Sequence, residues 1–111
     1  MADSYIEVTH TNFAEKVLNS PDLVIVNFSA GKSAACQIQD PEFEAVSKEY
    51  QERITFARLN VEAQTELTSQ LNVDGVPTLI FFKSGQEIYR IKGIVMRDKL
   101  RRRIEGVLLA N

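Results

Sequence analysis

Residues 23–28 constrain the fold of this chain more than any other segment. They read Leu-Val-Ile-Val-Asn-Phe, an almost continuous apolar run that is rich in β-branched residues. A run of this kind, without alternation of polar and apolar residues, is typical of a strand that is buried on both faces. Such a strand needs a packing layer on each side of its sheet, so the segment predicts an α/β fold with helices on both faces.

The rest of the 111 residues alternates between strand and helix patterns. Strands are predicted at residues 6–8, 23–28, 54–61, 76–82 and 87–92, and helices at residues 13–18, 34–50, 63–71 and 98–109. The first strands, joined by helices, should pair in parallel, and a hairpin turn near residues 83–86 should make the sheet mixed. Since no Pro-, Gly- or Ser-rich linker divides the chain, we expect one domain, residues 1–111.

Local signals predict how two of the helices begin and how one of them bends. Asn12, followed three residues later by Glu15, has the spacing of a capping box. Ser33 is the expected N-cap of the helix that starts at residue 34. Pro41 lies inside that helix and should interrupt or kink it near residue 40. The apolar face of the same helix is expected to consist of Ile38, Phe43, Val46 and Tyr50.

Composition excludes several classes of function. One cysteine and one histidine exclude an intramolecular disulfide and metal sites built from several thiolates or imidazoles. The net charge of −2 gives no general attraction to nucleic acid, and no apolar run approaches the ~18 residues of a membrane span. The first residues show no signal peptide, and a lone thiol fits a reducing compartment. We therefore expect a soluble cytoplasmic protein with no metal, no cofactor and no nucleic-acid or membrane partner; the oligomeric state stays open.

Residues 24–36 read Val-Ile-Val-Asn-Phe-Ser-Ala-Gly-Lys-Ser-Ala-Ala-Cys, and this segment resembles the thioredoxin family. In that family a buried strand leads into a Trp-Cys-Gly-Pro-Cys turn that opens a helix. The resemblance continues at Pro41 in the helix, at Arg58 near a strand end, in the segment Val76-Pro77-Thr78 and at Gly93. It covers nearly the whole chain and implies the thioredoxin fold, a central mixed sheet with helices on both faces. It also implies a cis peptide bond before Pro77.

The departures from the family pattern bear on function. Ser33 stands in place of the nucleophilic cysteine, and Cys36 in place of the second, resolving cysteine. Lys32 replaces the surface tryptophan, and Asn27 replaces the buried aspartate that assists proton transfer in the family. Dithiol exchange needs two sulfurs, so a Ser-Ala-Ala-Cys segment is not expected to perform it.

Cys36 has two interpretations that the sequence leaves open. As a residue near a helix N-terminus it is a candidate for monothiol redox chemistry, in which glutathione or a partner supplies the second sulfur in cell redox homeostasis. As the counterpart of the less exposed cysteine of the family, it is expected to be a buried apolar residue. A third scheme, in which another subunit lends a cysteine, ranks last. Ser33 is expected to cap the helix, because no base that would activate its hydroxyl is visible.

The favoured functional hypothesis is a protein-binding or chaperone-like module without conventional disulfide reductase activity. The resemblance implies that the backbone beside Pro77 is open to an extended peptide, a recognised binding mode. The expected partner surface comprises Lys32, Val76, Pro77 and Ile94, beside Gly31 and Gly93. The alternative is that the proline only shapes its loop.

Charge is distributed unevenly along the chain. Residues 83–111 hold eight basic and three acidic residues, a net charge of +5, whereas residues 1–82 hold five and twelve, a net charge of −7. Three consecutive arginines, at positions 101–103, lie on the last predicted helix. A solvated helix face explains them best, and an acidic protein partner remains an alternative.

Overall fold

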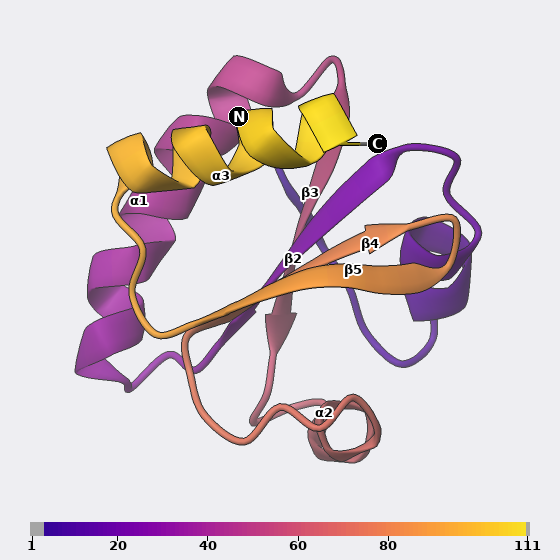
Figure 1. Ribbon diagram of the computed structural model, residues 1–111. Coiled ribbons are helices and arrows are strands. Elements are labelled where there is room, and N and C mark those ends of the chain that lie inside the picture. The colour runs from indigo at the N-terminus through magenta and orange to yellow at the C-terminus, as the bar shows by residue number, and fades with distance from the viewer. Residues whose placement is uncertain (1–3, 111) are drawn as a thin grey trace.

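The computed structural model describes residues 4–110 and shows a five-stranded sheet with helices packed against both faces (Figure 1). The elements are β1 (Ile6–Glu7), η1 (Ala14–Leu18), β2 (Leu23–Ser29), α1 (Ala34–Tyr50), β3 (Ile54–Asn60), α2 (Thr65–Gln70), β4 (Thr78–Lys83), β5 (Gln86–Lys92) and α3 (Arg97–Ala110). Residues 1–3, where we expected no signal peptide, lie outside the described part. None of the helices within residues 4–110 is long and apolar enough to cross a membrane.

The sheet is mixed, as the sequence predicted. Its strand order is β1-β3-β2-β4-β5. The pairs β1/β3 and β2/β3 are parallel, while β2/β4 and β4/β5 are antiparallel. The hairpin between β4 and β5 turns at Ser84 and Gly85, which have φ angles of 53° and 80°. Positive φ angles at two consecutive positions are typical of the tight turns that join antiparallel strands.

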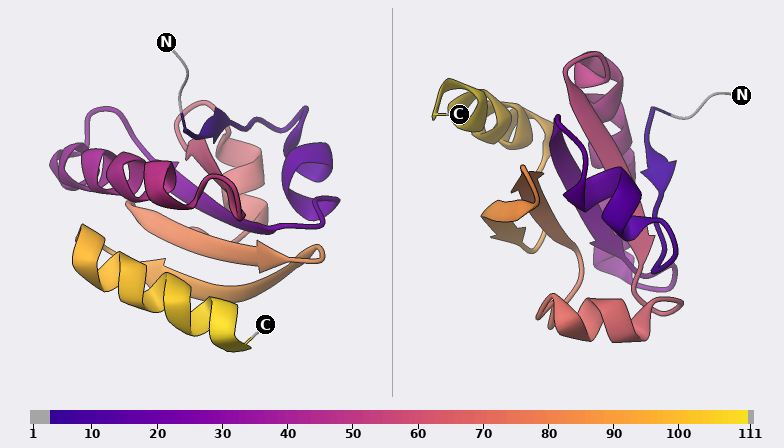
Figure 2. Two further views of the ribbon diagram at one scale, coloured as in Figure 1. Left: turned by 90° about the horizontal axis from the view of Figure 1, so that it is seen from above. Right: turned by 90° about the vertical axis from the view of Figure 1, so that its right-hand side faces the viewer.

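Strand β2 lies at the centre of the sheet and is buried along its whole length. Its side chains alternate between two hydrophobic cores: Ile25 packs into one core and Val26 into the other. Helices α1 and α3 cover the first core, and η1 and α2 cover the second. The right-hand view of Figure 2 shows α3 at the top and α2 at the bottom, with the strands between them. The expectation of helices on both faces is therefore confirmed.

The start of the first helical segment differs from the prediction. Asn12 does not cap a helix that follows it. Its Oδ1 instead accepts a hydrogen bond from the Thr9 N–H at 2.7 Å, while Thr9 Oγ1 accepts from the Thr11 N–H at 3.2 Å. The capping box therefore exists but begins three residues earlier, and with Thr9 as its cap it closes the turn of residues 9–13 that leads into η1. The following turn is wide, because the Asn19 N–H bonds to Ala14 O, five residues back.

Helix α1 differs from its prediction in two respects. It continues through Pro41 without interruption. Its buried face also includes Gln39, which is 0% exposed, whereas Ile38 is 49% exposed. Gln39 is satisfied because its side-chain amide both donates to Val95 O (3.1 Å) and accepts from the Val95 N–H (2.7 Å). This pair ties α1 to the loop that precedes α3.

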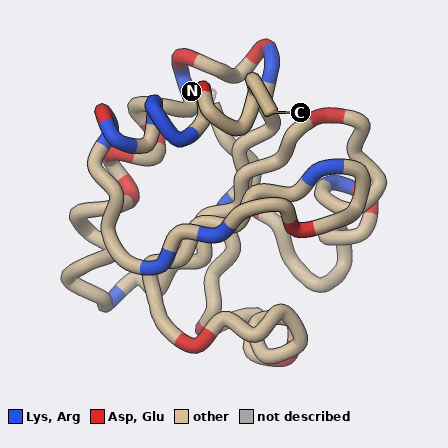
Figure 3. Tube along the Cα trace, viewed as in Figure 1, with Lys and Arg blue, Asp and Glu red and all other residues tan. Residues whose placement is uncertain are grey.

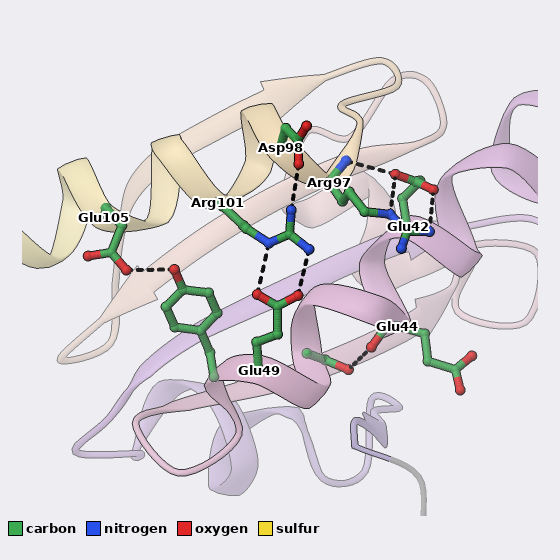
Figure 4. Close-up of polar contacts among 9 residues, drawn as sticks. Glu42, Glu44, Glu49, Arg97, Asp98, Arg101 and Glu105 are labelled. Atoms are coloured by element: carbon green, nitrogen blue, oxygen red, sulfur yellow. Dashed lines mark hydrogen bonds and ion pairs between the residues drawn. The ribbon is translucent and has the colours of Figure 1, made fainter.

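Two ion pairs join α1 to α3 at the surface. Arg97 Nη2 lies 2.8 Å from Glu42 Oε2, and Arg101 Nη2 lies 2.6 Å from Glu49 Oε2 (Figure 4). Hydrogen bonds from these arginines lower the pKa of both glutamates. Such solvent-facing pairs contribute little to stability individually. Together with Gln39, however, they fix how the two helices sit on the same face of the sheet.

Candidate functional site

Ser33 lies in the loop between β2 and α1 and caps the helix, as predicted. Its backbone is extended (φ −79°, ψ 123°), and its Oγ accepts a hydrogen bond from the Cys36 N–H at 3.2 Å. A cap of this kind contributes about 1 kcal/mol to stability. The hydroxyl is thus engaged in holding the helix N-terminus.

The side chain of Cys36 faces the protein interior. The residue is 1% exposed, and its Sγ accepts a hydrogen bond from the Ala30 N–H at 3.4 Å. The expectation of a buried cysteine is confirmed. A thiol in this position meets a solution reagent only when the surrounding structure opens.

A polar cluster that the sequence did not reveal surrounds Asp40, one helical turn after Cys36. Asp40 Oδ1 accepts from Asn27 Nδ2 at 2.9 Å and from Ser29 Oγ at 3.0 Å. Arg58 Nε lies 3.6 Å from the other carboxylate oxygen of Asp40. Asn27 thus bonds internally, as expected, although its Oδ1 has no partner among residues 4–110. The chain retains a carboxylate beside position 27, but α1 supplies it.

The loop before β4 contains the cis peptide bond between Val76 and Pro77. The Gly93 N–H donates to Pro77 O at 2.9 Å, so the loops at the ends of β4 and β5 lie side by side. Phe28 pairs with Thr78, which brings the end of β2, where the loop to α1 begins, to the same edge of the sheet. The expected partner surface is therefore assembled from three loops at one edge.

The members of this surface differ in exposure. Lys32 is exposed, Val76 is half-buried and Ile94 is 42% exposed. Pro77 itself is buried, so within this expected surface Lys32, Val76 and Ile94 are its solvent-accessible members. The cis peptide bond of Pro77 shapes the loop, and its neighbour Val76 is half-buried.

A hollow of about 450 Å³ adjoins Val76, between α2 and residues 73–76. Thr65, Thr68 and Val73 are among its lining residues. Two further exposed apolar side chains, Ile38 and Met96, neighbour the Gln39–Val95 pair in the chain. Sequence patterns did not indicate either side chain as exposed, because an apolar residue in a helix or loop ordinarily signals burial.

Residues 4–110 hold no group of three or more His, Cys, Asp and Glu side chains arranged to bind a metal ion. The single histidine, His10, is exposed, and its Nδ1 lies 3.1 Å from Gln64 Oε1.

Comparison with known proteins agrees with this architecture. Residues 4–106 match the family model described as Thioredoxin. The chain is 33% identical over 104 residues to chloroplastic thioredoxin X of Arabidopsis thaliana, an alignment that covers 92% of the chain and 57% of that protein. It is 33% identical over 103 residues to the bifunctional thioredoxin reductase/thioredoxin of Mycobacterium leprae, covering 93% of the chain and 22% of that protein. The chain thus spans less than two thirds of either relative.

Thioredoxin of Mycobacterium tuberculosis is 35% identical over 103 residues, and here the alignment covers 93% of the chain and 89% of the relative. The family-model match over residues 4–106 includes the sheet, the cis-proline loop and the segment that carries Ser33 and Cys36. The chain therefore belongs to the thioredoxin family.

Proposed function

We propose that this chain is a thioredoxin-like protein-binding module that works without the dithiol cycle. The observation that carries the proposal is the pairing of a buried single thiol with an open cis-proline loop. Cys36 is 1% exposed, whereas Lys32 and Ile94 at the same edge of the sheet face solvent. The thiol is therefore shielded from solvent, whereas side chains of the proposed contact surface are accessible to a partner.

The missing sulfur argues against conventional reductase activity. Disulfide exchange requires one thiolate to attack and a second thiol to resolve the mixed disulfide. The chain has one cysteine, and Ser33 uses its hydroxyl oxygen as a helix cap. A serine nucleophile also needs an adjacent base. His10, the single histidine, hydrogen-bonds Gln64 instead.

Backbone pairing is the binding mode that the cis-proline loop favours. Val76 lies outside β4, and within residues 4–110 neither its N–H nor its C=O has a hydrogen-bond partner. An extended peptide satisfies such groups by lying alongside them as an added strand. The hollow beside Val76 offers apolar contact for alternate side chains of that peptide.

The binding proposal is tested with short, uncharged, cysteine-free peptides rich in Val and Thr, followed by amide shifts in NMR spectra of the labelled protein. We expect the shifts to centre on Val76 and Ile94. N-methylation of the peptide backbone should abolish them, because it removes the donors that pair with Val76. Val76→Asp should weaken binding, whereas Leu109→Asp, a matched change at a side chain that is 89% exposed, should not. Binding that survives N-methylation would contradict the backbone mode.

The proposed lack of disulfide reductase activity is tested by insulin reduction with dithiothreitol as the electron donor. The wild-type chain should not exceed the rate of the donor alone. Ser33→Cys should raise the rate, because residue 33 already contacts residue 36 across the first turn of α1. Robust activity of the wild-type chain would overturn the proposal.

Monothiol chemistry through Cys36 is the second candidate, and it requires an accessible thiolate. Alkylation of the native protein distinguishes the two: labelling only after unfolding favours the binding module, and fast native labelling favours the monothiol. A lone buried cysteine also fits the reducing cytoplasm, where we propose that the protein acts.

A further inference from the structure

The arginines of α3 divide into two sets. Arg97 and Arg101 face α1 and are neutralised by Glu42 and Glu49, as Figure 4 shows. Arg102 and Arg103 are exposed, and no ion pair or hydrogen bond engages their side chains anywhere in the described chain, residues 4–110. The helix face that they occupy is therefore not balanced within the molecule. A charged face of this kind is open to an external anion.

Arg102 and Arg103 border a groove of about 290 Å³ between α3 and β5. Tyr89 and Ile88 line it from the strand. The strand is irregular here, because Phe82 pairs with Glu87 and Phe81 with Tyr89, which leaves Ile88 as an additional residue. A bulge of this kind redirects side chains at a sheet edge. The groove therefore has apolar side chains of β5 at its base and the two arginines, Arg102 and Arg103, at its border.

Gly106 lines the same groove and deepens it. It lies inside α3, where glycine is the least favourable residue apart from proline. No steric contact demands it, because a Cβ built there would meet nothing within 4 Å. The glycine thus lowers the stability of the helix relative to alanine, and no close packing contact requires it. Here its absent side chain leaves room beside Tyr89.

The charge distribution indicates that a ligand bound in this groove should be negatively charged. Residues 83–111 carry a net charge of +5, and Figure 3 shows basic positions along both α3 and β5. Residues 1–82 carry −7, which repels an extended polyanion that runs past the groove. Binding of nucleic acid takes many phosphate contacts. Two free arginines over an apolar floor instead fit a short segment with a few carboxylates and one apolar side chain.

We propose that the groove between α3 and β5 binds a short acidic segment of a partner protein. Its carboxylates pair with Arg102 and Arg103, and one apolar side chain packs on Tyr89 in the space left by Gly106. This site lies near the start of β5, whereas the cis-proline loop contacts Gly93, beyond the end of that strand. The two surfaces are separate, and either stands without the other.

The test uses a fluorescein-labelled, acetylated and amidated peptide with the repeat Glu-Asp-Leu-Glu-Asp, and its matched Gln-Asn-Leu-Gln-Asn form. Fluorescence anisotropy should show binding of the acidic peptide alone, weakening as salt is raised. Arg102→Gln with Arg103→Gln should weaken it by roughly tenfold or more. The control, Lys16→Gln with Lys48→Gln, changes the net charge equally and should alter affinity by about twofold at most.

Gly106→Leu provides the second test. Filling the space should abolish binding of the acidic peptide while the thermal midpoint stays equal to or above that of the wild type, because leucine favours the helix. In NMR spectra the acidic peptide should shift the amides of Tyr89 and Gly106 and not that of Val76. A shift centred on Val76 would assign the peptide to the other surface and overturn this proposal.

Four other results would also overturn it. Equal binding of the amide peptide would remove the role of charge. Equal losses in the arginine and lysine variants would show a general field without a site. Tighter binding of a short RNA, or association of the protein with itself at the concentrations used and no peptide binding, would assign the groove a different occupant.

Discussion

Replacing Asn27 by Asp places a second carboxyl against Asp40. In the native chain Asn27 Nδ2 donates to Asp40 Oδ1 at 2.9 Å, and both groups lie where α1 meets the sheet. The new group has no N–H to donate. At neutral pH two carboxylates at this separation repel each other unless one of them keeps a proton.

The magnitude follows from the distance and the exposure. Two unit charges about 4 Å apart interact with about 4 kcal/mol at an effective dielectric constant near 20. The Asp40 side chain is 34% exposed, and Arg58 Nε lies 3.6 Å from it, so solvent and a counter-charge reduce the repulsion. We expect about 2 kcal/mol of destabilisation at neutral pH, roughly half of the unscreened value.

The sign of the pH dependence distinguishes repulsion from a simple packing defect. Above about pH 4 the unfolded variant releases the proton that the folded variant keeps. The unfolded state then binds fewer protons, so stability falls as pH rises, by about 1.4 kcal/mol per pH unit. A total of about 2 kcal/mol corresponds to a window of about 1.5 units, from pH 4 to between 5 and 6.

The assay is urea unfolding at pH 4 and pH 7, followed by far-ultraviolet circular dichroism because the chain has no tryptophan. Two controls accompany Asn27→Asp. Asn27→Leu removes the amide without adding a charge, so its destabilisation should be the same at both pH values. The double variant Asn27→Asp with Asp40→Asn moves the carboxylate from the helix to the strand. It should recover most of the free energy of unfolding that Asn27→Asp alone loses at pH 7. Equal destabilisation of Asn27→Asp at the two pH values would refute the reasoning.

Three further changes test other parts of the structure. Thr9→Ala should lower the free energy of unfolding by about 1 kcal/mol, because Thr9 and not Asn12 caps the first helical segment; a null effect in urea unfolding would argue against that cap. Hydrogen bonds from Arg97 and Arg101 lower the pKa of Glu42 and Glu49, so their stabilisation is present above the unfolded pKa of about 4.5 and is lost as pH falls below it. Glu42→Gln with Glu49→Gln should flatten the acid limb of the stability curve, and an unchanged limb would show that the pairs contribute nothing. Burial, with a hydrogen bond to Glu105, raises the pKa of Tyr50 to about 12, so stability should fall as pH rises from about 10 to 12. Tyr50→Phe should remove this alkaline loss; an alkaline loss that persists in the variant would place its origin elsewhere.

The sheet was predictable because its signals are local. A continuous apolar run at residues 23–28 fills two cores, and both contain alternate side chains of β2 as the run requires. Ser33 precedes a helix with the residue type and spacing of a cap, and its Oγ makes that bond. These features depend on neighbours within a few residues.

The polar contacts were not predictable because they depend on how α1 is rotated against the sheet. The rotation turns Gln39 inward and Ile38 outward, against the preference of each side chain for its surroundings. It also brings Asp40 to Asn27, which is thirteen positions away in the chain. The available signal for that contact was the position of Asp40, an acidic residue directly before Pro41 and one helical turn after Cys36. The bond between the Gly93 N–H and Pro77 O likewise joins loops that lie far apart in the chain.

The bond between Gln39 and Val95 has a consequence for motion within the molecule. Because one side-chain amide takes both backbone groups of Val95, lifting the loop that carries Ile94 breaks two buried hydrogen bonds and leaves the Gln39 amide of α1 without those partners. Opening of the loop should therefore be coupled to loosening of the first half of α1. A peptide bound at Ile94 should slow amide hydrogen exchange in the turns of α1 around Cys36, although the peptide contacts neither α1 nor Cys36. Contact at the surface would in this way control how often the buried thiol meets solvent.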